Sequence, residues 1–211
     1  MNAMKSISPA QTWPFMLAMA VIVVASNFLV QFPVQLNLGS IQLAEILTWG
    51  AFTYPVAFLI TDLANRKFGP SNARLVVAAG FILAVVLSIW LATPRIAIAS
   101  GTAFLVAQLL DVSIFDRLRN STWWRAPLIS SLLGSALDTV LFFGLAFAPA
   151  FGMLDFGGED GSLGFGVPFL SVGAEVPLWI SLAAGDFIVK VLVGLAMLLP
   201  YGVAARRAAA A

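Results

Sequence analysis

The sequence LVVAAGFILAVVLSIWLATPRIAIASGTAFLVAQLLDVSIF, residues 75–115, decides the fold class of this chain. Pro94 divides it into two apolar runs, 75–93 and 95–115. Each run has about 20 residues, the length of α-helix that crosses the ~30 Å hydrocarbon core of a lipid bilayer. The connection at Pro94 is so short that the two helices must run antiparallel. The stretch therefore predicts a hairpin of two transmembrane helices.

The composition of the whole chain supports a membrane location. Of its 211 residues, 61% are hydrophobic and only 10% are charged, and the mean hydropathy is +0.98. A soluble domain of this size needs more charge on its surface. The formal net charge of +1 provides no basic surface for nucleic acid. We therefore expect the lipid bilayer as the surroundings and no nucleic-acid partner.

Four further apolar runs complete a single transmembrane domain, residues 1–211. A secretory signal peptide is the alternative for the first run, because Lys5 precedes it, but a run of about 20 residues is longer than a signal-peptide core. We therefore expect an all-α integral membrane protein of about six transmembrane helices. Their predicted ranges are 13–32, 48–62, 75–93, 95–115, 127–150 and 176–201.

The basic residues predict the orientation in the membrane. If the N-terminus is cytoplasmic, the outer segments hold only Arg95. The inner segments then hold Lys5, Arg66, Lys67, Arg74, Arg117, Arg119, Arg125, Arg206 and Arg207. This bias places both termini in the cytoplasm. The outer loop before the last helix is Gly-rich and acidic, so it is either a flexible surface loop or a lid over an outward-facing cavity.

Ionisable residues at membrane depth are the most informative feature. Asp138 follows Pro127 by eleven positions, which at 1.5 Å per residue places it ~16 Å along the fifth predicted helix, near the middle of the bilayer. Asp186 and Lys190 are four positions apart and share a face of the sixth helix. A charge at this depth costs at least ~2.5–3.5 kcal/mol on insertion scales. The three residues are therefore either a structural ion pair between two helices or a site for a ligand or a coupling ion.

Other polar, aromatic and small residues point toward the same interior. Asn27 and Gln31 are also four positions apart, and Phe142 lies one turn after Asp138. Trp49 and Phe142 have rings that can stack on a flat ligand. Small residues recur every four positions and predict close helix packing. They are Gly80, Ala84 and Ser88, then Ala99, Ala103 and Ala107, then Ser131, Ser135 and Thr139.

Two acidic residues near the inner helix ends precede arginines. Asp62 precedes Arg66 by four positions, and Asp111 precedes Arg117 and Arg119. Such Asp–Arg pairs can latch inner helix ends in one state of a transporter, or they can simply anchor the topology. We assign Asp62, Arg66, Asp111 and Arg117 to this gating or latch role.

The chain has no Cys and no His, which excludes whole classes of chemistry. There is no disulfide, no thiolate metal site and no Ser–His or zinc protease. A paired-aspartate protease would need Asp138 beside Asp186, and Lys190 argues against a proton shared between them. We expect no catalytic residue, no metal and no cofactor.

Several short strings in chain order resemble the queuosine precursor transporter family, also called the vitamin-uptake-like family. The strings are SNFLVQFPV (26–34), TWGAF (48–52), TDL (61–63), RIA (95–97), LDV (110–112), DT (138–139) and LP (199–200), with Gln108, Asp186 and Lys190. The resemblance covers nearly the whole chain.

The resemblance implies an importer in the bacterial inner (plasma) membrane that carries 7-cyano- and 7-aminomethyl-7-deazaguanine, precursors of the tRNA base queuosine. It also implies a six-helix fold similar to the substrate-binding subunits of energy-coupling-factor vitamin transporters, working without their ATPase module. The alternative is a binding subunit or carrier for another planar, vitamin-like molecule that needs a separate ATPase module. A homodimer is compatible with such a small helical body.

The chemistry of a deazaguanine suits the deep polar residues. Its ring N–H and exocyclic amine lie side by side and can bind one carboxylate together, while an aromatic wall can stack on the ring. The candidate substrate-binding residues are Asp138, Phe142, Asp186, Lys190, Asn27, Gln31, Gln108, Trp49 and Arg95.

Overall fold

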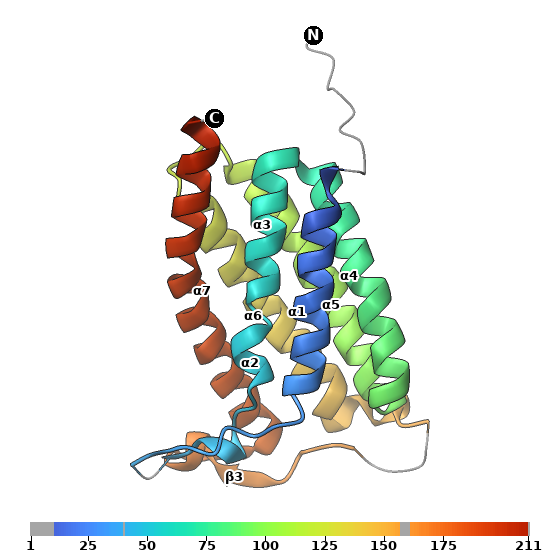
Figure 1. Ribbon diagram of the computed structural model, residues 1–211. Helices are drawn as coiled ribbons and strands as arrows, with labels where there is room; N and C mark the ends of the chain where they lie inside the picture. The colour runs from blue at the N-terminus through green and yellow to red at the C-terminus, as the bar shows by residue number, and fades with distance from the viewer. Residues whose placement is uncertain (1–10, 40, 157–160, 211) are drawn as a thin grey trace.

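The computed structural model describes residues 11–39, 41–156 and 161–210, with side chains as far as Arg206. Lys5, Glu159 and Asp160, which contributed to the predicted orientation and loop, lie outside the described residues. The helices run side by side along one axis (Figure 1). They are α1 (Trp13–Leu29), the short α2 (Gly50–Thr53), α3 (Val56–Phe68), α4 (Pro70–Leu91), α5 (Pro94–Leu118), α6 (Arg125–Phe147) and α7 (Leu178–Ala210).

Short elements close one end of the bundle (Figure 1). Two antiparallel hairpins lie there, in which Asn37 pairs with Gln42 and Val167 pairs with Val176. The strands are β1 (Asn37–Leu38), β2 (Ile41–Gln42), β3 (Gly166–Pro168) and β4 (Glu175–Pro177). Three 3-10 turns accompany them, η2 (Leu43–Glu45), η3 (Pro149–Leu154) and η4 (Phe169–Ser171).

Four of the described helices have the length and hydropathy of a membrane span: Pro70–Leu91, Pro94–Leu118, Arg125–Phe147 and Leu178–Arg206. α1 is apolar but has only 17 residues. α3 has 13 residues and packs against α4, α5 and α7. α4 and α5 meet at Pro94 and pack against each other as an antiparallel hairpin.

Proline residues account for most differences between the observed and predicted helix ends. The predicted helix 48–62 is α2 and α3, separated at Tyr54 and Pro55, because the proline has no N–H to continue the hydrogen-bond ladder. α4 begins at Pro70 rather than 75, since proline suits the first position of a helix. α6 ends at Phe147 rather than 150, because Ala148 precedes a proline and is extended.

The first and last helices also differ from their predicted ranges. α1 ends at Leu29 rather than 32, because a turn at residues 30–31 follows it directly and leads to Pro33, which pairs with Thr48. α7 passes through Pro200 and continues to Ala210, beyond the predicted end at 201. A kinked or tilted helix can tolerate one proline where the surroundings satisfy the freed carbonyl.

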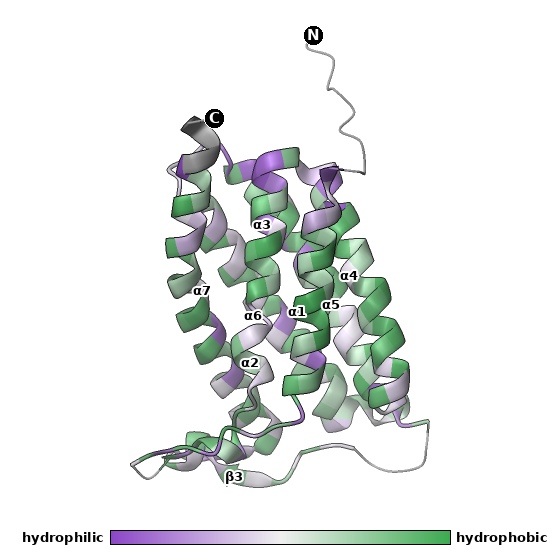
Figure 2. Cartoon of the chain, in the orientation of Figure 1, coloured by the Kyte–Doolittle hydropathy of each residue, from purple (hydrophilic) through white to green (hydrophobic). Residues whose placement is uncertain are grey.

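The distribution of polarity is that of a membrane protein. Large apolar side chains cover the outside of the bundle, and Trp90 is 83% exposed. Figure 2 shows hydrophobic residues along most of the length of the helices. The interior instead contains charged residues, and the buried ones are Asp62, Arg95, Asp111, Asp138 and Lys190. An exposed apolar surface around a charged interior is stable only in lipid.

Small residues let the helices approach closely, as the repeated spacing predicts. Ala99, Ala103 and Ala107 are all buried on α5, which packs along α6. A Cβ added at Gly134 of α6 would lie 2.7 Å from the Phe58 ring of α3. At Gly134, the interface between α3 and α6 therefore has room for glycine and for no larger residue.

The basic residues gather at the end of the bundle where α1 begins and α7 ends (Figure 1). Arg66 and Lys67 lie in the last turn of α3, Arg117 lies in the last turn of α5, and Arg125 begins α6. The hairpins close the opposite end. We refer below to the basic end and the hairpin end.

Candidate functional site

The ionisable residues that were predicted at membrane depth meet between α6 and α7. The Nζ atom of Lys190 lies 2.7 Å from Oδ2 of Asp138 and 2.5 Å from Oδ2 of Asp186. It also donates to Oγ1 of Thr139 at 3.2 Å, and Thr139 in turn donates to Oδ2 of Asp186 at 2.8 Å. These four residues form what we call the Lys190 network.

The Lys190 network carries more negative than positive charge. Two carboxylates face one ammonium group, so its formal charge is −1. The side chains of Lys190 and Asp138 are each only 4% exposed, whereas that of Asp186 is 14% exposed. All of these contacts use the Oδ2 atoms, so the Oδ1 atoms of both carboxylates remain as acceptors. A ligand with paired N–H donors, or with a positive charge, would complement this arrangement.

Aromatic rings flank the Lys190 network. The ring centre of Tyr54, at the break between α2 and α3, lies 5.8 Å from Nζ of Lys190 in a cation–π contact. Phe142 is half-buried one turn beyond Asp138 and contacts the rings of Phe143 and Phe147, with centroids 5.1 and 5.9 Å away. The network therefore lies close to flat apolar surfaces on α6 and beside α3.

Sequence reasoning missed Thr139 and Tyr54 as parts of this site. Thr139 was assigned to a stripe of small packing residues, although it follows Asp138 directly and its hydroxyl bridges Lys190 and Asp186. Tyr54 was not among the candidate substrate-binding residues. The proline after it was the available signal, because a break in a membrane helix exposes backbone and side chains to the interior.

The predicted residues of α1 and of the loop after it lie apart from the Lys190 network. Asn27 donates to the carbonyl of Val23 at 2.9 Å, and Gln31 donates to the carbonyl of Asn27 at 3.3 Å. Both amides are therefore bound to their own helix end. Trp49 is exposed and packs on the Phe52 ring, with centroids 5.6 Å apart.

Arg95 is occupied by structural contacts near the hairpin end. The residue is 2% exposed, and its NH1 atom lies 2.6 Å from Oδ2 of Asp155. Its Nε atom donates to the carbonyl of Leu145 at 2.9 Å, and NH2 donates to the carbonyl of Ala148 at 2.6 Å. All three nitrogens thus join the start of α5 to the end of α6 and to the loop beyond, and we call these contacts the Arg95 clamp.

Gln108, Asp62 and Asp111 form a second polar cluster, closer to the basic end. Asp62 of α3 accepts hydrogen bonds of 3.3 Å from Ser130 and from Ser131 of α6. Gln108 accepts one of 2.7 Å from Thr61. Asp111 is fully buried one helical turn after Gln108, and neither of its carboxyl oxygens has a hydrogen-bond partner among the described residues.

The predicted Asp–Arg latch pairs are not formed in this conformation. Arg66 donates to the carbonyl of Arg119 at 2.5 Å, and Arg119 pairs with Asp116 at 3.5 Å. Arg117 is exposed. Neither Asp62 nor Asp111 forms an ion pair with an arginine in the part of the chain that the structure describes.

The helical bundle, its apolar exterior and its charged interior define the class of this protein as an all-α integral membrane protein. The sequence matches the family described as "Putative vitamin uptake transporter" over residues 48–93 and 88–204, and the chain belongs to that family. Both polar clusters lie within the matched residues. Membership of a transporter family means that the chain is not an enzyme.

The names of similar proteins agree with a family of transporters. The chain is 34% identical over 210 residues to the "Probable queuosine precursor transporter" of Haemophilus influenzae, covering 86% of this chain and 81% of the relative. It is 34% identical over 206 residues to the "Queuosine precursor transporter" of Escherichia coli K12, covering 86% and 80%. A relative from Bacillus subtilis, also a "Probable queuosine precursor transporter", is 27% identical over 53% of this chain and 62% of its own length.

No solved structure matches the chain. The expected likeness to the substrate-binding subunits of energy-coupling-factor transporters therefore stays a prediction.

Proposed function

We propose that this protein imports queuosine precursors, the 7-cyano- and 7-aminomethyl-7-deazaguanine bases, into the bacterial cytoplasm. The names of two relatives that each match 86% of the chain support the substrate class. The observation that carries the proposal is the Lys190 network, in which the buried carboxylate of Asp138 and the partly buried carboxylate of Asp186 share one ammonium group between α6 and α7.

The substrate would bind by completing the Lys190 network. A deazaguanine offers a ring N–H and an exocyclic amine side by side, and a carboxylate accepts both. Asp138 and Asp186 each have an Oδ1 atom that the network does not use. The base would lie against Tyr54 or Phe142, where stacking contributes ~1–3 kcal/mol per base.

The membrane arrangement belongs to the same proposal. We infer six spans, formed by α1, by α2 with α3, and by α4, α5, α6 and α7. We place the basic end in the cytoplasm of an inner-membrane protein, since Lys and Arg favour that side. The gathering of Arg66, Lys67, Arg117 and Arg125 at this end supports the orientation.

Complementation tests the proposed function. The protein is expressed in a strain that neither makes nor imports queuosine precursors, and queuosine in tRNA is measured after a small amount of precursor is supplied. We expect wild type and the surface variant Asp116→Asn to restore queuosine, and Asp138→Asn to fail. If wild type is present in the membrane and restores nothing, the substrate assignment is wrong.

Purified protein in proteoliposomes tests whether the chain works alone. Uptake of labelled deazaguanine without any ATPase component supports an independent transporter. Binding without uptake would instead support a substrate-binding subunit for a planar, vitamin-like molecule, which the family description also allows.

A further inference from the structure

Two carboxyl groups are buried between α3 and α5, away from the Lys190 network. Asp62 lies on α3 and Asp111 on α5, and both residues are buried. The hydrogen bonds from Thr61 to Gln108 and from Asn65 to the carbonyl of Val112 hold α3 against α5 on either side of these two residues. Neither takes part in the ion pairs of the described residues, which join Arg95, Arg119 and Lys190 to other carboxylates.

The charged and titratable groups around this pair leave it without a bound cation. Arg66 of α3 is held by the carbonyl of Arg119, and Arg119, which follows α5, is held by the carbonyl of Asn65 and by Asp116. α6 presents only the hydroxyls of Ser130 and Ser131 to Asp62. α7 contributes Tyr201, which lines a cavity together with Asp62 and whose buried hydroxyl has no hydrogen-bond partner among the described residues.

Unsatisfied polar atoms mark the same place. Among the described residues, no hydrogen-bond partner reaches either oxygen of Asp111 or the Nε2 atom of Gln108. Gln108 precedes Asp111 by one helical turn, and its other amide atom binds Thr61, the neighbour of Asp62. Leaving buried polar groups unpaired is costly, so this set indicates a ligand that supplies the missing hydrogen bond.

The smallest such ligand is a proton. Two carboxylates buried together and away from water cannot both stay ionised, whereas a single proton turns their repulsion into an O–H···O hydrogen bond. We propose that Asp62 and Asp111 share one proton, and that this is the ion whose movement drives uptake. The role of the proton in uptake rests on the proposed transport function, whereas the sharing of a proton by the two carboxyl groups does not.

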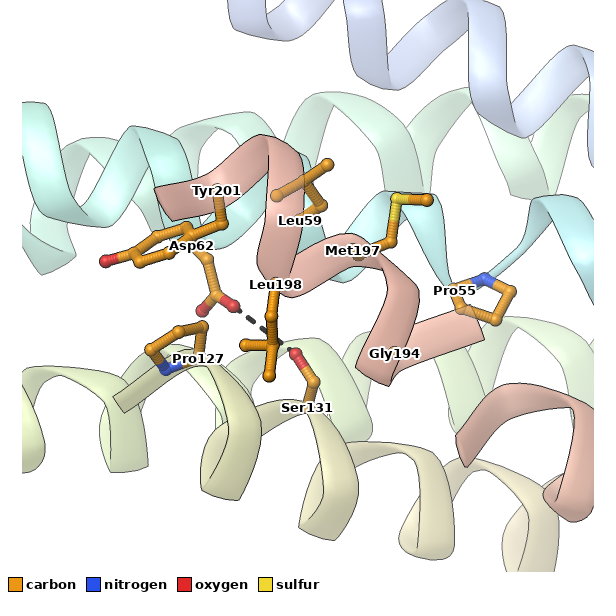
Figure 3. A pocket seen from close by; sticks show the side chains of 9 residues that line it. All are labelled: Pro55, Leu59, Asp62, Pro127, Ser131, Gly194, Met197, Leu198 and Tyr201. Atoms are coloured by element: carbon orange, nitrogen blue, oxygen red, sulfur yellow. Dashed lines mark hydrogen bonds between the residues drawn. The ribbon is translucent and has the colours of Figure 1, made fainter. Parts of the chain in front are cut away.

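A small cavity offers the proton a way out. It measures about 10 Å³, room for one water molecule, and its lining includes Asp62, Ser131 and Tyr201 (Figure 3). In this cavity the acid O–H bond breaks, the proton passes to water, and a carboxylate is left behind. The proton would leave toward the basic end, where Arg66 and Arg119 lie.

One helix connects this cavity to the Lys190 network. Met197 and Leu198 of α7 form a wall of the cavity, and Lys190 lies about two turns earlier on the same helix. α6 likewise carries Ser131 at the proton site and Asp138 at the network. A shift of α7 that admits water to Asp62 therefore also changes the position of Lys190, which couples proton release to substrate release.

Infrared spectroscopy on purified protein tests proton binding without any substrate. We expect the wild type at neutral pH to give the C=O band of a buried protonated carboxyl group. Asp111→Asn should lose the band, because its amide can donate to an ionised Asp62. The matched control Asp116→Asn, on the same helix but ion-paired at the surface, should keep it. Absence of the band in the wild type, or its persistence in Asp111→Asn, would overturn the proposal.

Proteoliposomes with an imposed pH gradient test coupling. One pH unit, acidic outside, should drive about tenfold accumulation if one proton accompanies each substrate molecule. Asp111→Asn should lose this accumulation while still exchanging labelled for unlabelled substrate, which shows that it is folded. Accumulation driven by a sodium gradient instead, or exchange without any response to pH in the wild type, would refute proton coupling. A chain that moves no deazaguanine at all refutes the proposed function and leaves the infrared result standing.

Discussion

Lys190 and Asp138 face each other across the interface of α6 and α7, with Nζ 2.7 Å from Oδ2 and each side chain only 4% exposed. The pair is joined by Asp186, so one ammonium group serves two carboxylates. This geometry is compatible with both interpretations that the sequence left open, a structural ion pair and a substrate site. Variants of the two residues distinguish them.

The substitution Asp138→Asn separates binding from stability. It keeps the size of the side chain but replaces one acceptor by a donor, which would then face a donor of the substrate. Losing a charged hydrogen-bond pair should cost roughly 2–3 kcal/mol, about thirtyfold to more than a hundredfold in affinity. The measurement is ligand affinity on monodisperse protein, with the melting temperature recorded in parallel. Near-normal affinity would move the binding role to Asp186.

The double variant Asp138→Asn with Lys190→Met tests the structural alternative. If the pair only holds α6 and α7 together, the double variant should recover both stability and binding relative to the single ones. If Asp138 binds substrate, stability should recover and affinity should not. A double-mutant cycle of unfolding free energies and affinities gives the answer.

Lys190→Met alone should destabilise the protein strongly. It leaves Asp138 and Asp186 buried without a counter-ion, and removing one partner of a buried ion pair costs about 3–5 kcal/mol. Lys67→Met, an exposed lysine at the end of α3, is the matched control and should change little. If Lys190→Met and Lys67→Met have equal unfolding free energies, Lys190 does not stabilise the protein as a buried counter-ion.

Gly134→Ala tests the close packing of α3 against α6. The new methyl group would lie 2.7 Å from the Phe58 ring, and overpacking of this kind costs about 1–3 kcal/mol. Gly144→Ala, on the same helix with open space around its Cβ position, should be neutral or slightly stabilising. Denaturation in detergent compares the unfolding free energies of the two variants. If Gly134→Ala is as stable as the wild type, α3 and α6 lie further apart than described.

Arg95→Gln tests the Arg95 clamp. Because Arg95 holds Asp155 and two carbonyl groups, its loss should cost about 3 kcal/mol or more of stability. Affinity of the folded fraction should stay unchanged. Arg125→Gln, at the exposed start of α6, should stay within about 0.5 kcal/mol. A loss of affinity at full stability would return Arg95 to the substrate site.

Cysteine labelling tests the orientation, and the natural chain gives no background because it has no Cys. Ser162→Cys should react with an impermeant reagent in intact cells. Ala209→Cys, near the end of α7, should react only after the cells are opened. Labelling of Ala209→Cys from outside would reverse the proposed topology.

The sequence was sufficient for features that depend on spacing within one helix. Asp186 and Lys190 are four positions apart and do form an ion pair. The hairpin at Pro94 follows from the length of two apolar runs. The buried alanines of α5 follow from their regular spacing.

Features that depend on how helices are rotated against each other were not accessible. Asp62 and Asp111 each have an arginine nearby in sequence, yet the rotation of α3 and α5 buries both carboxyl groups in the bundle, while Arg66 and Arg119 bind other partners. Arg95 belongs to one of the strings that resemble the family, but besides Asp155 its partners are backbone carbonyls at the end of α6, which no side-chain pattern reveals.

The two ends of the bundle are closed by different kinds of structure, and we expect the two ends to move at different rates. At the hairpin end, β2 and η4 lie over the helices, and one of the bonds that fasten them is from the backbone of Leu170 to Ser181 of α7. Loops of this kind rearrange in nanoseconds to microseconds, whereas packed helices move in microseconds to milliseconds. We therefore expect the loops of the hairpin end to move away from the helices and return many times for each movement of α7 at the basic end. The slower helix movement would then set the turnover rate.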